Sequence, residues 1–421
     1  MVEVRKPIQV KEAVERVMKD IPHVQTEVVQ MEESDNRILQ EPVIARHAIP
    51  AFDKSPYDGF ALRSIDIQKA SKETPCICKV IDHIGAGELS QETLDENEAT
   101  RIMTGAQIPD GADCVVMFEK CHAFENEHGS YISLEQPLVQ GENIIVKGQE
   151  VTKGDVLVQE GTRINPGVKA ILATFGYKEV RVAKKPLVGI IATGTELLDV
   201  DEALQPGKIR NSNAYMTVSQ VIRAGADYTY IGKLADDLET SYQTIKDTLE
   251  KVDILITTGG VSVGDFDLMP EIYEMLHADV LFNKVGMRPG SVTTVAKKGN
   301  QFLFGLSGNP SACYVGFELF TRPVIQKLLG VETPYLKRTK AILAEDFPKY
   351  NPFTRFVRSY ITYTENGLQV HLAGMDKSNV VTSLAKTNCL MQLPSDTGGY
   401  KQGDMVDCLL LENSEGQVVF Q

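Results

Sequence analysis

The stretch DILITTGGVSVGDFD at residues 253–267 decides the fold of this chain. Its apolar run, 254–256, is continuous, as expected of a parallel strand that is buried on both faces of a sheet. The polar, glycine-rich run that follows is typical of the turn at the carboxyl end of such a strand. LVGIIAT at 187–193 repeats this character. The two stretches together predict a doubly wound α/β domain.

Helical patterns separate the predicted strands on either side of this stretch. Apolar residues at helical spacing follow LVGIIAT and again follow YTYIGKLADD (228–237), and a further helix is expected to begin at Pro270. The helical residues in question are Ala214, Val218, Val221 and Ile222, then Leu238, Tyr242, Ile245 and Leu249. The alternation of strand and helix ends near Gly330, so the sequence predicts an α/β domain over 184–331.

Short β-rich runs cut by glycine turns occupy the regions on both sides of that domain. CICKVI, DCVVMF, SYISL, NIIV and DVLVQ lie between 74 and 160, and they predict a small barrel-like β domain. The last 90 or so residues are expected to form a small antiparallel β domain, 332–421. Helices are expected at 10–18 and from Pro166 to Gly176. We expect these two helices to share a discontinuous N-terminal domain, 1–47 and 146–183, with the β domain, 48–145, inserted between its parts.

Composition narrows the class of protein. The chain has 421 residues and a formal net charge of −14, which disfavours general binding to nucleic acid or to anionic membranes. No apolar run approaches the ~20 residues of a membrane-spanning helix, and the first 20 residues lack the apolar core of an export signal. The seven cysteines form no CxxC pair, and Cys76 and Cys78 would share one face of a strand. We expect a cytoplasmic protein with free thiols.

Three polar turns follow predicted strands of the α/β domain, and ligands bind at such strand ends. Glycines allow close backbone approach to an anion, free N–H groups stabilise its charge, and hydroxyls add neutral donors. A single turn of this kind is explained as well by the need for a tight turn, but three in one domain favour a binding site. Their spacing matches neither a dinucleotide fingerprint nor a P-loop. The candidate substrate-binding residues are Thr193, Gly194, Thr258, Gly259, Gly260, Ser262, Ser307, Gly308, Asn309 and Ser311.

Acidic residues fall at the same predicted strand ends. Carboxylates beside a phosphate-binding loop suggest Mg²⁺, which takes one or two carboxylates together with phosphate oxygens. The alternative is helix capping, which would account for Asp237 in particular. The candidate metal ligands are Glu196, Asp236, Asp265 and Asp267, and Lys284 and Arg288 would supply positive charge for an oxyanion.

Five motifs, taken in order, resemble the molybdopterin molybdenumtransferase family, which includes the E domain of gephyrin. They are DKSPYDGFA (53–61), RIMTGAQIPDGADCVV (101–116), ATGTEL (192–197), TTGGVSVGDFD (257–267) and GLSGNPSA (305–312). The resemblance implies a homodimer of four-domain subunits, with the active site between domain three of one subunit and domain two of the other. It also implies that adenylylated molybdopterin and molybdate react, with Mg²⁺, to give molybdenum cofactor and AMP.

The resemblance assigns catalytic roles residue by residue. These residues are Asp58 and Thr104 in domain two, and Glu196, Asp236, Asp267, Lys284, Arg288 and Pro310 in domain three. It further implies that Arg288 and Ser262 hold molybdate, and that an adenylyltransferase and recipient molybdoenzymes are candidate partners. Many members have a lysine and a proline where this chain has Ser291 and Val292, and a proline where it has Ser307.

Two other functions compete with this interpretation. The first is adenylylation of molybdopterin by ATP, because the third domain resembles the adenylyltransferases of the preceding step. The second is a non-catalytic scaffold, because the related gephyrin domain also binds peptides. The β domain and the DKSPYDG segment favour the insertion reaction over the first, and retention of all the acidic positions favours it over the second.

Overall fold

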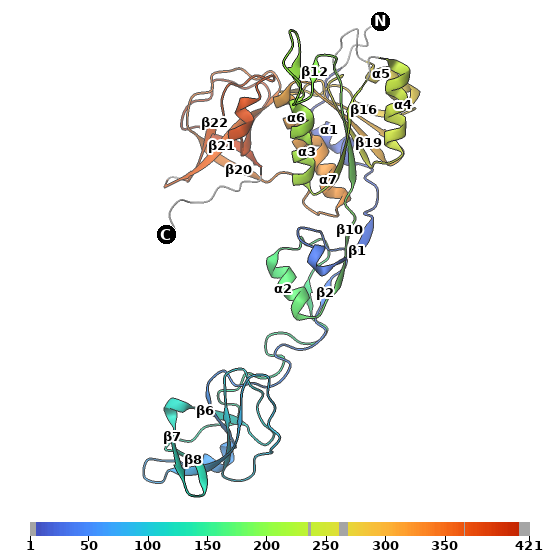
Figure 1. The fold of residues 1–421 in the computed structure, drawn as a ribbon. Helices are drawn as coiled ribbons and strands as arrows, with labels where there is room; N and C mark the ends of the chain where they lie inside the picture. The colour runs from blue at the N-terminus through green and yellow to red at the C-terminus, as the bar shows by residue number, and fades with distance from the viewer. Residues whose placement is uncertain (1–5, 235–236, 261–267, 366, 412–421) are drawn as a thin grey trace. The chain divides into compact units, whose positions relative to one another are not determined.

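The computed structural model describes residues 6–234, 237–260, 268–365 and 367–411, in two compact units (Figure 1). The first unit is formed by 1–40, 161–165 and 179–421, and the second by 41–160 and 166–178. The predicted substrate and metal residues Ser262, Asp236, Asp265 and Asp267 lie outside the described residues.

A six-stranded sheet forms the centre of the first unit. Its order is β14 (Asp227–Lys233), β11 (Leu187–Ala192), β15 (Ile254–Thr258), β19 (Gln301–Leu306), β18 (Thr294–Lys298) and β16 (Asp279–Phe282). The first four strands are parallel, as the continuous apolar runs predict. The last two are antiparallel, which the sequence patterns did not indicate.

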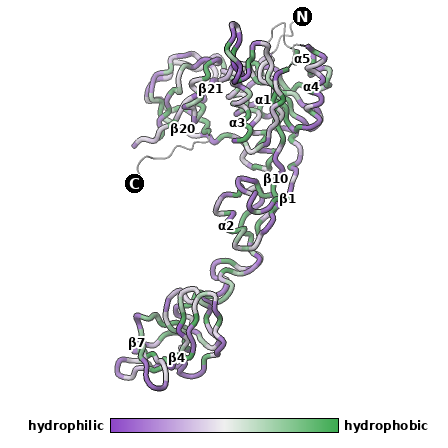
Figure 2. The backbone as a smooth tube through the Cα atoms, in the orientation of Figure 1, coloured by the Kyte–Doolittle hydropathy of each residue, from purple (hydrophilic) through white to green (hydrophobic). Residues whose placement is uncertain are grey.

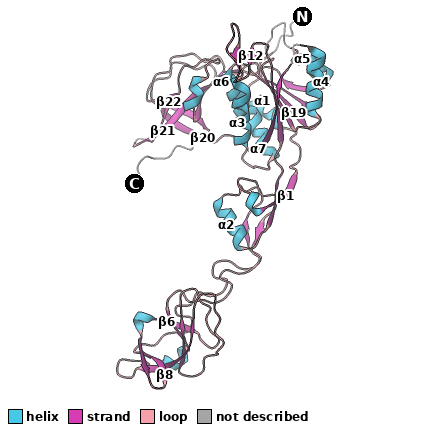
Figure 3. Cartoon of the chain, in the orientation of Figure 1, coloured by secondary structure: helices cyan, strands magenta, loops and turns pink. Residues whose placement is uncertain are grey.

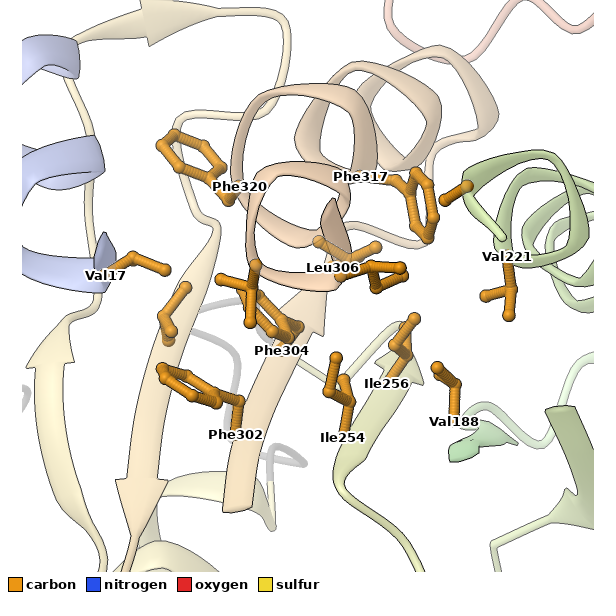
Figure 4. Packing of buried hydrophobic residues seen from close by; sticks show 14 of the residues in the cluster. Val17, Val188, Val221, Ile254, Ile256, Phe302, Phe304, Leu306, Phe317 and Phe320 are labelled. Atoms are coloured by element: carbon orange, nitrogen blue, oxygen red, sulfur yellow. The ribbon is translucent and has the colours of Figure 1, made fainter. Parts of the chain in front are cut away.

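Helices cover both faces of this sheet (Figures 1 and 3). On one face lie α3 (Ser212–Ala224), α6 (Pro310–Gly316), a π-helical turn (Phe317–Thr321), α7 (Arg322–Leu328) and α1 (Val10–Met18). On the other lie α4 (Leu238–Leu249) and α5 (Met269–Met275). Alternate strand residues point to opposite faces, so Ile254 and Ile256 join the first core and Leu255 joins the second. Figure 4 shows the first core, where strand residues face Val221 of α3 and the phenylalanines that follow α6.

The C-terminal β domain is a second sheet within the first unit. Its order is β17 (Met287–Arg288), β21 (Thr354–Thr364), β22 (Gly367–Leu372), β20 (Arg338–Leu343), β24 (Met405–Leu410) and β23 (Cys389–Leu393), and β23 also pairs with β21. The pairs β20–β24, β21–β22, β21–β23 and β23–β24 are antiparallel as expected, whereas β20 pairs with β22 in parallel. The strand β17, which precedes the expected domain, pairs with β21 in parallel. A separate two-stranded ribbon joins β1 (Thr26–Gln30) to β10 (Glu179–Ala183).

The second unit contains the predicted small β domain. Its sheet has the order β6 (Cys114–Met117), β3 (Gly59–Leu62), β5 (Glu98–Ile102), β4 (Cys76–Ile84), β8 (Gly129–Leu134) and β7 (His122–Asn126). The strand expected at NIIV (143–146) is absent from this described segment, because positive φ angles at Gly141 and Asn143 turn the backbone there. Cys78 is buried in the core of this sheet and the half-buried Cys76 packs against it, and all seven cysteines are free.

The predicted fold class is confirmed, and helices occur at 10–18 and from Pro166 as expected. The helix α1 packs in the core of the first unit, whereas α2 (Pro166–Thr174) belongs to the second. The boundaries proposed for four domains stay a prediction. Apolar residues are spread over many short stretches (Figure 2), and no described helix has the length and apolar character needed to cross a membrane.

Candidate functional site

The described parts of the three predicted turns meet at the carboxyl edge of the central sheet. The strands β11, β15 and β19 are direct neighbours, so the segments at their carboxyl ends, 193–196, 257–260 and 307–311, are brought side by side. We refer to these three segments as the strand-end cluster. The sequence predicted a polar turn at each of these strand ends, and the strand order shows that the three strand ends are adjacent.

Backbone hydrogen bonds tie the cluster together. The amide of Thr193 donates to the carbonyl of Thr258 over 3.2 Å, and the amide of Gly259 donates to the carbonyl of Leu306 over 2.8 Å. Gly259 has a φ of +105°, and a Cβ there would lie 2.7 Å from the carbonyl oxygen of Thr193. Only glycine therefore allows the middle segment to pass this close to its neighbour.

Two hydroxyls at the end of β15 are buried without a partner. Thr257 and Thr258 are each 2% exposed, and neither Oγ1 atom has a hydrogen-bond partner among the described residues. Such atoms are unfavourable unless a bound polar group or water satisfies them. A polar group bound at the strand ends would satisfy these hydroxyls, and the substrate-binding role of Thr258 stays a prediction.

The third segment is partly engaged by the protein itself. The hydroxyl of Ser307 accepts the amide of Asn309 at 3.3 Å, and Pro310 occupies the first turn of α6. Ser311 is fully buried, and it donates from its amide to the carbonyl of Ser378 (3.0 Å) and from its hydroxyl to the carbonyl of Val380. Ser311 thus uses both donors on the C-terminal β domain.

The predicted acidic ligands are represented among the described residues by Glu196 alone. Its carboxylate is exposed and lies against Gly194, where a side chain would overlap it. Across the described part of the chain, no group of three or more His, Cys, Asp or Glu residues is arranged to hold a metal ion. Asp237 accepts the amide of Thr240 at 2.7 Å at the start of α4, so the capping alternative holds for that residue.

The two predicted cations lie on the segment that precedes and includes β17. Lys284 is half-buried, and its carbonyl accepts the amide of Ile8 at 3.2 Å. Arg288 is exposed, with its guanidinium 5.9 Å from the centre of the Phe353 ring. The loop after Arg288 packs on α6, because a Cβ on Gly290 would lie 3.3 Å from the carbonyl oxygen of Ala312. This packing brings the loop next to the helix that begins within the third segment.

Two residues at the cluster were not predicted. Asn213 is 7% exposed, and its Nδ2 donates to the carbonyl of Gly308 at 2.8 Å, while its Oδ1 has no partner among the described residues. Lys208 donates from Nζ to the carbonyl of Thr195 at 2.6 Å. The polar run KIRNSN (208–213), placed just before a helix, was the available signal.

In the second unit, Asp58 and Thr104 form a local pair. Asp58 Oδ1 accepts the amide of Thr104 at 2.7 Å and its hydroxyl at 2.8 Å. These hydrogen bonds favour the ionised form and hold the pKa of the Asp58 carboxyl below its usual value. Tyr57, which precedes Asp58 in the sequence, is 45% exposed. The pair therefore presents a fixed, ionised carboxylate at neutral pH.

The chain matches three family descriptions in succession. Residues 8–176 match the MoeA N-terminal region (domain I and II), 189–327 match a probable molybdopterin binding domain, and 340–411 match the MoeA C-terminal region (domain IV). Together these ranges cover most of the chain.

Whole proteins of high similarity were also found. The chain is 56% identical to the molybdopterin molybdenumtransferase of Bacillus subtilis (strain 168), over 99% of this chain and 97% of that protein. It is 50% identical to the molybdopterin molybdenumtransferase of Staphylococcus aureus (strain MSSA476), over 99% of each. Among solved structures, a molybdopterin biosynthesis moeA protein from Pyrococcus horikoshii gives a TM-score of 0.85 at 26% identity, over 97% of this chain and 100% of that one.

Proposed function

Because this chain belongs to the molybdopterin molybdenumtransferase family, we propose that it inserts molybdate into adenylylated molybdopterin and releases AMP in a Mg²⁺-dependent reaction. The family makes the chain a transferase of molybdenum cofactor biosynthesis. The proposal adds the adenylylated substrate, the leaving AMP and the metal ion.

The observation that carries this proposal is the strand-end cluster. The backbone at Gly259 passes too close to Thr193 for any side chain, and the buried hydroxyls of Thr257 and Thr258 lack partners among the described residues. The same is true of the Oδ1 of Asn213, beside Gly308. Neutral hydroxyl donors and a glycine-rich backbone at the strand ends suit a substrate with a phosphate group. We assign this cluster to the phosphate-bearing part of the substrate.

The remaining charged residues are assigned to the reacting groups. Glu196, with Asp236, Asp265 and Asp267, would hold Mg²⁺, and the exposed carboxylate of Glu196 is the kind of oxygen ligand this ion prefers. When bound, Mg²⁺ would neutralise charge on the phosphate oxygens. Lys284, Arg288 and Ser262 would bind molybdate, and Pro310 would shape the turn beside them.

We also propose a cytoplasmic homodimer in which each subunit completes the site of the other. Asp58 and Thr104 of one copy would face the strand-end cluster of the second copy, in accordance with the resemblance on which these roles rest. The fixed ionisation of Asp58 supports a role in orienting a polar substrate group. Analytical ultracentrifugation tests the dimer, and a monomer that retains full activity at low concentration would contradict it.

The decisive experiment measures AMP release from adenylylated molybdopterin by the purified protein, with Mg²⁺, in the presence and absence of molybdate. Molybdate-dependent release is expected. Release that is equally fast without molybdate would contradict insertion, and ATP consumption with molybdopterin alone would establish the adenylyltransferase instead. No release from a folded dimer that binds the substrate would favour a scaffold.

Variants of the acids locate the site. Glu196→Gln should raise the Mg²⁺ concentration needed for half-maximal release, whereas Glu239→Gln, in the exposed first turn of α4, should not. Asp236→Ala and Asp267→Ala should abolish release while the dimer persists. An unchanged Mg²⁺ titration for Glu196→Gln would remove that residue from the metal site.

A further inference from the structure

A segment of the C-terminal β domain is fastened to the strand-end cluster. This segment, 373–381, joins β22 to a 3₁₀ helix (Thr382–Lys386), and we call it the β22 loop. Its carbonyls at Ser378 and Val380 accept both donors of Ser311, which is fully buried at the start of α6. The position of the β22 loop therefore bears directly on the 307–311 turn.

Apolar burial does not hold this loop in place. Met375 is 61% exposed and Val381 is 47% exposed. Lys377 and Asn379 are also exposed. A segment with so little apolar burial depends on its polar contacts for a fixed position.

Those polar contacts converge on Asp376. Its side chain is only 6% exposed, and its carboxylate pairs with Arg355 Nη1 at 2.8 Å and with Lys349 Nζ at 3.2 Å. Arg358 Nη2 lies 3.7 Å from the same carboxylate and donates to the carbonyls of Met375 (3.2 Å) and Lys377 (3.1 Å). Arg355 and Arg358 both come from β21, a strand inside the domain, so the loop is attached to a rigid element.

Loss of Asp376 would remove the acid on which the charged contacts of the loop converge. Its carboxylate is the acidic partner of two guanidinium groups whose side chains are 9% and 1% exposed. Removing the acid from such a buried pair leaves its partners uncompensated. The loop would then be held by hydrogen bonds to its backbone, among them those from Arg358, and its position against Ser311 would be less fixed.

We propose that Asp376 is a positioning residue for the reaction, which holds the β22 loop against Ser311 and thereby sets the 307–311 turn for substrate. The expected effect of Asp376 on the kinetics rests on the proposed function. The structural link between Asp376 and Ser311 does not depend on that function, so the link and the function can be tested separately.

The test compares Asp376→Asn and Asp376→Glu with a matched control, Asp346→Asn. Asp346 lies in the same domain, pairs with a lysine at 2.9 Å and accepts a backbone amide, but it has no contact with the β22 loop among the described residues. Hydrogen exchange of the Ser311 amide measures the attachment without any catalysis. Steady-state AMP release in the presence of molybdate separates KM for the adenylylated substrate from kcat.

For Asp376→Asn we expect exchange at Ser311 to be about tenfold faster, because a charge-assisted attachment is lost. KM should rise about tenfold with kcat within about twofold. Asp376→Glu should recover part of both effects, and Asp346→Asn should change neither. Lys349→Met removes the exposed lysine that pairs with Asp376, and it should raise the exchange rate at Ser311 and KM by a smaller factor. This variant replaces Asp376→Asn if the latter does not fold.

Unchanged exchange at Ser311 in Asp376→Asn, or in Lys349→Met if the former does not fold, would overturn the proposal. Equal changes in Asp346→Asn would do the same. If the wild type releases no AMP but exchange at Ser311 is faster in Asp376→Asn, the structural link between Asp376 and Ser311 is supported and the proposed function is contradicted.

Discussion

Alanine at position 259 would place a Cβ 2.6 Å from Thr193 Oγ1 and 2.7 Å from the Thr193 carbonyl oxygen. The hydroxyl can rotate away, but the carbonyl belongs to the backbone that links two segments of the strand-end cluster. The φ of +105° adds a second cost, because L-residues rarely adopt it. Gly259→Ala must therefore move one segment relative to the other.

The magnitude follows from these two terms. The positive φ alone costs about 1–2 kcal/mol, and strain at a crowded backbone position adds about 1–3 kcal/mol. We expect a total of about 2–5 kcal/mol, or a fall of several degrees in the melting temperature of the first unit. Gly207 is the matched control, because it has a φ of +75° in the same unit but nothing within 4 Å of its Cβ position. Gly207→Ala should cost only about 1 kcal/mol.

Differential scanning calorimetry measures the stability of both variants, and molybdate-dependent AMP release measures their activity. Gly259→Ala should lose at least about tenfold in kcat/KM, since small displacements at a site have large effects, whereas Gly207→Ala should stay within about twofold. Equal melting temperatures for the two variants would refute the argument from backbone crowding. Normal release by Gly259→Ala would remove this turn from the site.

Three further changes test other parts of the molecule. Thr104→Val should raise the pKa of Asp58, because the hydroxyl of Thr104 donates a hydrogen bond that lowers this pKa. As the pH falls, stability from the ionised carboxylate would then be lost at a higher pH than in the wild type, and NMR titration of Asp58 checks the pKa. Burial raises the pKa of Glu318, so the folded state keeps this proton to a higher pH than the unfolded chain does. The free energy of unfolding of the wild type, relative to that of Glu318→Gln, should therefore fall as the pH rises from about 4.5. Denaturation at several pH values measures this difference, and a difference that does not change with pH would contradict the prediction. Phe304→Ala should cost about 3–5 kcal/mol, because the ring is 1% exposed in the main core, whereas Tyr363→Ala, at an 84% exposed residue, should cost less than about 0.5 kcal/mol by calorimetry.

Local patterns predicted most of the elements around the site. Continuous apolar runs at 187–192 and 254–256 are buried parallel strands, and Pro310 opens a helix after a polar turn. These features depend on residues close in the sequence, so their chemistry is visible without the fold. The NIIV run failed because turn geometry at Asn143 overrides its β propensity.

The sequence by itself determined the kind of fold, the polar character of the strand ends and, through five motifs in order, the family. Only the tertiary structure decided that β11, β15 and β19 are neighbours, that Asn213 reaches Gly308, and that Ser311 uses its donors on a loop more than sixty residues away in sequence. The physical reason is that hydrogen bonds and strand pairing between distant residues depend on how the whole chain packs. Periodicity reports which face of an element is buried, and it carries no information on which partner buries it.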